Sequence, residues 1–306
     1  MVTGRTIRSL TVAAAALAVG AAAALTAPLP APAAPTTIRK ADVRGARIAW
    51  RAIGHGRPLL LINGSGATLD TWDPPLLSAL ARTRRVIVYD PRGLGASTGG
   101  ATRGVAADAE DAAGLLRALG VRRADVLGWS YGGYVAQELA LRHPRDVRRI
   151  VLASTDFGGP TARLPAARYR ALDARSTLGK VSADELLDLL FPRPAWAIGR
   201  AWFTRLVTQP GGCCETSSQR ALRAVVRAYR DRWYGRGGGT RARLGRLRLP
   251  VLIGAGARDN DVPVVNARLL RRLIRGARLV VYGDAGHAFL VQHERDFAAR
   301  VRRFLG

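Results

Sequence analysis

Residues 125–133 read Asp-Val-Leu-Gly-Trp-Ser-Tyr-Gly-Gly, and they are the most informative stretch of the chain. An apolar run typical of a buried strand comes first, and a helical pattern follows from Tyr131. Between them stands Gly-x-Ser-x-Gly, the pattern of a strand-to-helix turn so sharp that its serine, Ser130, adopts strained backbone geometry. Gly128 and Gly132 leave out side chains that would clash in such a turn. The stretch therefore predicts a nucleophilic serine beside the free N–H groups and positive dipole end of a helix.

Short apolar runs alternate with helical patterns on both sides of this turn. That alternation indicates a mostly parallel sheet with helices on both faces, an α/β fold. Runs such as residues 59–62 and 86–88 are continuously apolar, as in strands that are buried on both faces. The patterns predict strands at 47–53, 58–62, 85–89, 124–128, 147–154, 250–255 and 277–282, and helices at 105–119, 262–274 and 297–305.

The alternation stops between about residues 157 and 249, where no convincing strand pattern occurs. Ser182 and Glu185 have the spacing of a capping box that opens a helix. The apolar residues from Leu222 to Trp233 recur at helical spacing. We expect an all-helical insertion whose two ends lie at the carboxyl edge of the strands, where α/β sheets bind ligands. The insertion is therefore predicted to be a lid over Ser130.

Two further stretches resemble known sequences. Residues 90–97 read Asp-Pro-Arg-Gly-Leu-Gly-Ala-Ser, which looks like the Asp-x-Arg-Gly-x-Gly-x-Ser loop of the α/β-hydrolase family. The run from Asp111 to Ser154, with Ser130 in it, resembles that family's central block. The resemblance covers nearly all of the chain after its N-terminal segment. It implies an eight-stranded type of sheet with an inserted helical lid, and a chain order of serine, acid and histidine, each after a strand.

The resemblance assigns the acid to Asp259 and the base to His287. Asp259 has the family's glycine three residues before it and the proline four residues after it, whereas the rival Asp261 is interpreted as a helix N-cap. His287 stands in a Gly-His pair after the last predicted strand. Serine needs a base to remove its proton during attack, and the carboxylate fixes the tautomer of the imidazole. The other three histidines have structural explanations in turns or at helix ends.

An oxyanion hole completes such a site. The resemblance assigns one donor to the backbone N–H of Tyr131 and the second to the backbone N–H of Ser65. The family's usual His-Gly pair before the second donor is Asn63-Gly64 here, and asparagine can still hydrogen-bond this loop. The identity of the second donor therefore stays open. We expect neither a metal nor a cofactor, since the sequence contains no metal-binding constellation.

The chain has 306 residues, 48 of them Lys or Arg and 22 Asp or Glu, with a formal net charge of +26. Lysine occurs only at Lys40 and Lys180, so the excess is arginine, which we interpret as the bias of a GC-rich genome. An alternative is electrostatic attraction to anionic polymers at a cell surface. No nucleic-acid-binding motif is present. Cys213 and Cys214 are adjacent and allow either a vicinal disulfide or two free thiols.

The first 33 residues have the order of a secretory signal: Arg5 and Arg8, an uncharged alanine-rich stretch over residues 10–25, then Ala-Pro-Ala at 31–33. We expect cleavage after Ala33 and a secreted or extracytoplasmic α/β-hydrolase domain over residues 34–306, with the lid at about 157–249. The alternative, an uncleaved membrane anchor, is disfavoured because the apolar stretch is shorter than the roughly 20 residues that a spanning helix requires.

These features predict a secreted serine hydrolase that cleaves a carboxylic ester or related acyl bond of a small molecule through an acyl-enzyme. Trp129, Trp196 and Trp202 indicate an apolar substrate site, although aromatic residues at helical spacing also form cores. The sequence does not distinguish an ester from a thioester, lactone or amide, and it leaves the oligomeric state open. The alternatives are a cofactor-free perhydrolase or lyase, or a binding protein that kept the fold.

Overall fold

Eight strands form one sheet in the order β1-β2-β4-β3-β5-β6-β7-β8 in the computed structural model, which describes residues 37–209 and 217–306. The pairs β1–β2 and β2–β4 are antiparallel, and every other neighbouring pair is parallel. The predicted signal peptide at 1–33 and the pair Cys213-Cys214 lie outside the described residues. The strands are β1 (Arg39–Val43), β2 (Ala46–Ile53), β3 (Arg57–Ile62), β4 (Arg84–Tyr89), β5 (Ala124–Trp129), β6 (Val147–Ala153), β7 (Val251–Gly256) and β8 (Arg278–Tyr282).

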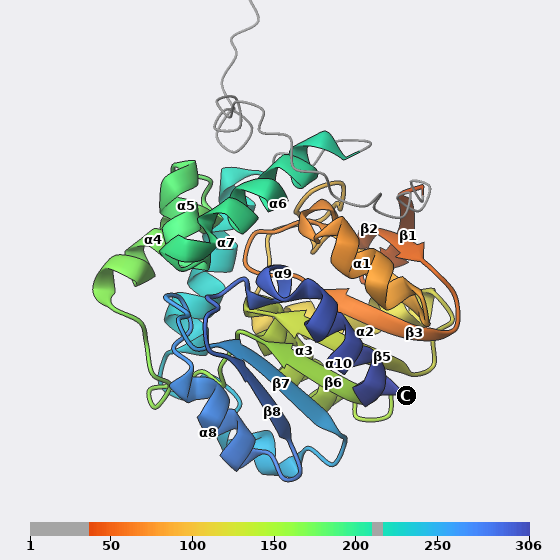
Figure 1. The fold of residues 1–306 in the computed structure, drawn as a ribbon. Helices are drawn as coiled ribbons and strands as arrows, with labels where there is room; N and C mark the ends of the chain where they lie inside the picture. The colour runs from red at the N-terminus through yellow and green to blue at the C-terminus, as the bar shows by residue number, and fades with distance from the viewer. Residues whose placement is uncertain (1–36, 210–216) are drawn as a thin grey trace, which may run out of the picture.

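The two faces of the sheet are both buried, as the continuous apolar runs predict. In β3, Leu60 and Ile62 belong to one core cluster, while Leu59 and Leu61 belong to the other. This is the period of two that a strand imposes on its side chains. The first cluster packs under α2 (Val105–Ala118), α3 (Tyr131–Arg142) and α8 (Val265–Leu273), and the second under α1 (Pro74–Ala81), α9 (Phe289–Gln292) and α10 (Glu294–Leu305) (Figure 1).

Between β6 and β7 the described residues form helices joined by turns and loops and include no strand, as predicted. The capping box is confirmed: Ser182 Oγ accepts from the Glu185 N–H, and the Glu185 carboxylate accepts from the Ser182 N–H. We call the whole segment 157–249 the helical insertion. Its elements are α4 (Ala167–Thr177), α5 (Ala183–Leu190), η3 (Arg193–Ala195), α6 (Trp196–Thr208), α7 (Gln219–Arg227), η4 (Ala228–Trp233) and η5 (Arg241–Arg246), and α4 to α7 lie together beyond one end of the sheet (Figure 1).

Contacts tie the insertion to the rest of the fold. The guanidinium of Arg205, in α6, donates to both carboxylate oxygens of the buried Asp73 at 2.9 Å, just before α1. Gln209, at the end of α6, donates to the carbonyl of Asp70 in the short helix η2 (Leu69–Thr71). A two-pronged arginine–carboxylate pair fixes orientation as well as distance. One side of the insertion is therefore anchored to the loop between β3 and α1.

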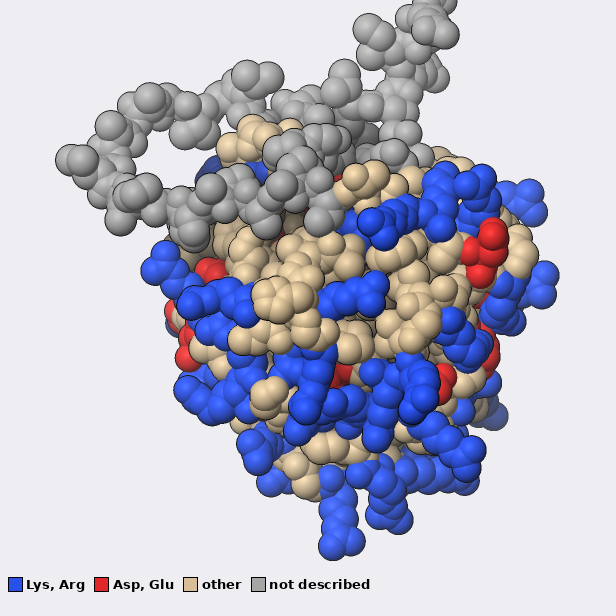
Figure 2. Space-filling model, turned by 90° about the vertical axis from the view of Figure 1, so that its right-hand side faces the viewer, with Lys and Arg blue, Asp and Glu red and all other residues tan. Residues whose placement is uncertain are grey.

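Basic side chains are spread over the face shown in Figure 2, with few acidic side chains among them. A general arginine bias would distribute basic side chains over the surface in this way. Binding to anionic polymers stays a prediction. Within residues 37–209 and 217–306, none of the helices has both the length and the apolar character needed to span a bilayer.

Candidate active site

Ser130 stands in strained backbone at the junction of β5 and α3. Its φ is 54° and its ψ is −121°, a combination that side-chain-bearing residues rarely adopt. A Cβ on Gly128 would lie 2.2 Å from the carbonyl oxygen of Gly132, and one on Gly132 would lie 2.0 Å from that of Ile62. Neither backbone oxygen can move away without breaking the sheet-to-helix junction. The glycines of the Gly-x-Ser-x-Gly pattern are therefore required sterically.

His287 and Asp259 lie together after β8 and β7. His287 Nδ1 is 3.1 Å and 3.0 Å from the two carboxylate oxygens of Asp259. Asp259 Oδ1 also accepts from the backbone N–H groups of Asp261 and Val262, at 2.8 Å and 2.7 Å. Because these donors hold the carboxylate, it can fix both the orientation of the His287 ring and its tautomer.

The backbone of His287 is held by β5 and β6 as well. Its carbonyl oxygen accepts from Ser154 Oγ at 2.8 Å and from Trp129 Nε1 at 3.2 Å. Only 2% of the residue is exposed. Trp129 thus acts here as a support for the histidine.

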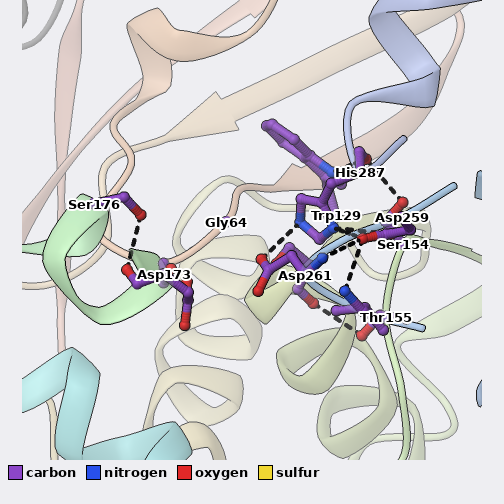
Figure 3. Close-up of polar contacts among 12 residues, drawn as sticks. Gly64, Trp129, Ser154, Thr155, Asp173, Ser176, Asp259, Asp261 and His287 are labelled. Atoms are coloured by element: carbon purple, nitrogen blue, oxygen red, sulfur yellow. Dashed lines mark hydrogen bonds and ion pairs between the residues drawn. The ribbon is translucent and has the colours of Figure 1, made fainter. Parts of the chain in front are cut away.

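Asp261 takes a position that the sequence analysis did not expect. The helix α8 begins only at Val265, with Val264 as its N-cap, so the interpretation of Asp261 as an N-cap is wrong. Its Oδ2 lies 3.4 Å from His287 Nε2 instead. Figure 3 shows the His287 ring between the carboxylates of Asp259 and Asp261. The described residues include no hydrogen bond from Ser130 Oγ to His287, and such contacts often form only when substrate binds.

The oxyanion donors predicted at Tyr131 and Ser65 flank Ser130. Tyr131 is the first residue of α3, so its backbone N–H has no acceptor within the helix. Asn63 pins the loop that carries Ser65: its amide donates to Thr68 O at 2.9 Å, and its Oδ1 accepts from the Gly64 N–H. The expectation that asparagine would hold this loop is confirmed.

A cavity of about 200 Å³ opens beside Ser130. Its walls come from both parts of the fold, and more than half of the lining residues belong to the helical insertion. The lining residues are Ser65, Ser130, Tyr131, Tyr134, Leu164, Pro165, Arg170, Asp173, Tyr229, Arg230, Tyr234, Asp261 and Val262.

None of the three tryptophans predicted to bind substrate is among those lining residues. Trp129 and Trp202 are buried with ring centroids 6.2 Å apart, and Trp129 also contacts Trp72 at 6.1 Å. Trp196 is half-buried beneath the guanidinium of Arg193. The structure therefore places these rings in core packing, away from the described cavity.

The charges around His287 shape its protonation. Burial lowers its pKa, but the carboxylates of Asp259 and Asp261 outweigh burial and raise the pKa to about 9. Burial, followed by the charge of Asp173, raises the pKa of Asp261 well above its ordinary value. Burial also raises the pKa of Asp173, although Tyr229 and His287 act against it. The two carboxylates thus favour the protonated form of His287, while burial and Asp173 favour the protonated form of Asp261.

Tyr131 connects the cavity with a buried carboxyl behind it. Its hydroxyl donates to Asp108 Oδ2 at 2.5 Å, and Thr102 donates to the other oxygen at 2.5 Å. Burial raises the pKa of Asp108 to about 6 despite these hydrogen bonds. The hydroxyl end of the Tyr131 ring is therefore fixed, and the backbone N–H of the same residue is a proposed oxyanion donor.

The sequence analysis missed Asp173, Tyr134, Tyr229 and Tyr234 as cavity residues. They come from α4, α3, η4 and the residue after η4, where they follow no motif that marks a ligand contact. The one available signal was the second acid after β7, Asp261. Among the described residues, no group of three or more acidic, histidine or cysteine side chains could hold a metal ion.

A strained serine, an Asp–His pair and a cavity at the carboxyl edge of a parallel sheet define a hydrolase site of the α/β type. The model of the alpha/beta hydrolase fold family matches residues 57–294. The chain belongs to this family and is a hydrolase of that fold.

Two relatives in sequence and one solved structure show which proteins the chain is similar to. A 2-hydroxymuconate semialdehyde hydrolase from a Pseudomonas species is 30% identical over 282 residues, which cover 87% of this chain and 93% of the relative. A pimeloyl-acyl-carrier-protein methyl ester esterase from Neisseria meningitidis is 32% identical over 264 residues, which cover 81% and 93%. The solved structure of an alpha/beta hydrolase fold protein from Chitinophaga pinensis has a TM-score of 0.78 at 26% identity and covers 89% of this chain and 98% of its own.

Proposed function

We propose that this protein is a serine hydrolase that cleaves a carboxylic ester through an acyl-enzyme on Ser130. The observation that supports this most is the pairing of Asp259 with His287 Nδ1 at 3.0 Å, next to a cavity that Ser130 lines. An imidazole held in this way leaves Nε2 as the position that exchanges protons with the nucleophile. The esterase among the relatives acts on a methyl ester, which agrees with the proposed bond type.

The proposed reaction has two halves. In the first, His287 Nε2 accepts the hydroxyl proton of Ser130 while Oγ attacks the ester carbonyl carbon. The oxyanion that forms is stabilised by the backbone N–H groups of Tyr131 and Ser65. Collapse of this intermediate breaks the ester bond, and the leaving alcohol takes the proton from His287. Ser130 then carries the acyl group as an ester.

In the second half, water replaces the alcohol. His287 Nε2 accepts a proton from the water as its oxygen attacks the acyl carbon, and the same two N–H groups stabilise the new oxyanion. The carboxylic acid leaves, and Ser130 recovers its proton from His287. One ester and one water thus give one acid and one alcohol, and the protein returns to its starting state.

The helical insertion is proposed as the lid of this site and as the part that selects the substrate. It supplies Asp173 from α4 and Tyr229 from η4 to the cavity wall, opposite residues of the sheet. A cavity of about 200 Å³ has little room, which favours a short acyl group. We also propose export by the segment 1–33 with cleavage after Ala33, which N-terminal sequencing of protein from the culture medium would test.

Purified protein should react with a fluorophosphonate probe and hydrolyse p-nitrophenyl acetate or butyrate faster than the decanoate. Ser130→Ala is the control and should lose both activities. Absence of labelling in folded protein would favour a binding protein. Labelling accompanied by peracid formation from acetate and hydrogen peroxide, with little ester turnover, would favour a perhydrolase.

A further inference from the structure

We infer that the cavity beside Ser130 binds an ester whose alcohol part carries an ammonium group, and that Asp261 and Asp173 recognise this cation. The inference rests on the proposed ester hydrolysis and adds a substrate class to it. It also makes Asp261 and Asp173 residues that determine specificity.

Neither carboxylate forms an ion pair with an arginine or lysine among the described residues. No lysine or arginine of the described chain lies within ion-pair distance of Asp261 or Asp173, although the chain contains 48 such residues. The one cation paired with Asp261 is His287, which the proposed reaction needs in its neutral form. Two half-buried carboxylates that line one cavity repel one another unless a positive charge or a proton joins them. A positively charged substrate group would supply that charge.

The tyrosines of the cavity are a second, independent observation. The Tyr229 hydroxyl is buried, with 5% of the residue exposed, and forms no hydrogen bond of normal geometry with the described residues, although it lies near Asp173. A buried hydroxyl whose contacts with Asp173 and Thr177 are poorly aligned is costly, and a ligand that offers a well-aligned partner would relieve this cost. Tyr131, Tyr134 and Tyr234 also line the cavity. Tyrosine rings beside carboxylates form the kind of surface that attracts ammonium groups.

Most of the charged groups that act on Asp261 are negative. Asp173, from α4, is the strongest neighbouring charge, and His287, Asp259 and the buried Asp156 follow. Figure 3 shows Asp173 on the side of Asp261 that is away from His287.

Two arginines also line the cavity, and the charge of Arg230 lowers the pKa of Asp173. Arg170 is half-buried and donates to the Pro165 carbonyl, while Arg230 is exposed. Water screens an exposed charge strongly, so the repulsion between Arg230 and a cation at Asp261 is weak, and neither arginine is among the charges that shift the pKa of Asp261.

The position of Asp261 assigns the cation to the alcohol rather than to the acyl group. His287 Nε2 must reach the oxygen of the leaving alcohol in order to protonate it. Asp261 Oδ2 lies 3.4 Å from that nitrogen. An ammonium group bound there takes over the ion pair with Asp261, and His287 then holds its proton less tightly. Binding of the cation therefore frees His287 to accept the proton of Ser130.

The test compares two esters of the same shape. Butyrylcholine and 3,3-dimethylbutyl butyrate differ by one positive nitrogen in place of a carbon, and hydrolysis of both is followed by pH titration. We measure kcat/KM for wild type, Asp261→Asn and Asp173→Asn. The control is Asp184→Asn, which removes an acid of the insertion whose side chain is 68% exposed and paired with Arg200. Thermal unfolding shows which variants fold.

We expect wild type to prefer the cationic ester by about tenfold or more, a difference of about 1.4 kcal/mol. The preference should fall toward one in Asp261→Asn and Asp173→Asn and persist in Asp184→Asn. A wild-type preference of one or less, or an unchanged preference in both cavity variants, overturns the inference. If neither ester is hydrolysed and Ser130 does not label, the proposed function fails instead. Calorimetry on Ser130→Ala then decides, since tighter binding of choline than of 3,3-dimethylbutanol supports the cation site and equal binding overturns it.

Discussion

Asp261 Oδ2 lies 3.4 Å from Nε2 of His287, the ring nitrogen that must face the nucleophile in the proposed reaction. Asp259 holds the other ring nitrogen at 3.0 Å, so the imidazole is placed between two carboxylates. Such an arrangement stabilises the imidazolium and raises the pKa of His287. The two acids therefore have opposite effects: Asp259 orients the base, while Asp261 competes with Ser130 for it.

The proposed nucleophile and base should act as a unit. Ser130→Ala and His287→Ala are each expected to lower kcat on a p-nitrophenyl ester by a factor on the order of 10³ or more, and the double variant should be little worse. The reason is that neither group can do its part without the other. Additive losses in the double variant would contradict the shared step.

The two acids should differ on substitution. Asp259→Asn removes the charge and one acceptor at His287 Nδ1, so kcat on a neutral ester should fall by about 10²-fold or more. Asp261→Asn removes the competitor at Nε2, so turnover of the same neutral ester at pH 7 should hold or rise. If Asp261→Asn is the damaging change and Asp259→Asn is mild, the assignment of the acid is wrong.

The pH profile should report the raised pKa of His287, which is about 9 in the free protein. Because the base must be neutral, kcat/KM for a neutral ester should rise with pH through about 9 rather than through the ordinary histidine value of about 6.5. Asp261→Asn should move this rise to lower pH. A wild-type profile that is flat from pH 7 to pH 10 would show that His287 is not charged in the resting protein.

The same raised pKa has a consequence for folding stability. The folded protein binds the His287 proton more tightly than the unfolded chain does. The resulting stabilisation is fully present below about pH 6.5 and is lost as pH rises through about 9. Comparing urea unfolding of wild type and His287→Ala at pH 6 and pH 10 isolates this contribution.

The elbow glycines should tolerate no side chain. Gly132→Ala places a Cβ 2.0 Å from the backbone oxygen of Ile62, so we expect a loss of more than about 3 kcal/mol in unfolding free energy and no probe labelling. Gly245→Ala is the control, because no atom lies within 4 Å of its added Cβ. Unfolding in urea checks both variants, and equal stability would remove the steric explanation of the Gly-x-Ser-x-Gly pattern.

Asn63 should matter for turnover more than for binding. Asn63→Ala removes the hydrogen bonds to Thr68 O and from the Gly64 N–H, so the loop that carries Ser65 loosens. If the Ser65 N–H stabilises the oxyanion, kcat should fall by about 10-fold to 10²-fold with KM nearly unchanged. A rise in KM alone would move Ser65 from the oxyanion hole to ground-state binding.

The central strands, α3 and the positions of Ser130 and His287 could be predicted because each depends on residues that are adjacent in the chain. An apolar run, a glycine pattern and a following helix are local signals. β1 was missed because its five residues are mostly exposed and polar; it exists through antiparallel pairing with β2 across the turn at Arg44-Gly45.

The walls of the cavity could not be predicted for a different reason. Asp173 and Tyr229 reach the site through the packing of α4 and η4 onto the sheet, which no short pattern encodes. Trp202 illustrates the converse error. A tryptophan at helical spacing produces the same sequence pattern whether it packs in a core or lines a ligand site, so the pattern could not tell the two apart. The role of Asp261 depends on the residue at which α8 begins. The boundaries of a helix cannot be placed from sequence to within a residue or two.

β6 and β7 are hydrogen-bonded neighbours, although the chain leaves the sheet after Ala153 and returns only at Val251. The entropy of closing so long a loop grows slowly, by about 0.6 kcal/mol for each doubling of its length. Insertions and deletions in the loops of this segment therefore cost little closure entropy, whereas an exchanged helix must also replace the buried contacts that its predecessor made with the two cores. Natural variation and laboratory recombination can thus replace the substrate-facing layer while the reacting groups keep their places, which gives the scaffold a high capacity to acquire new specificities.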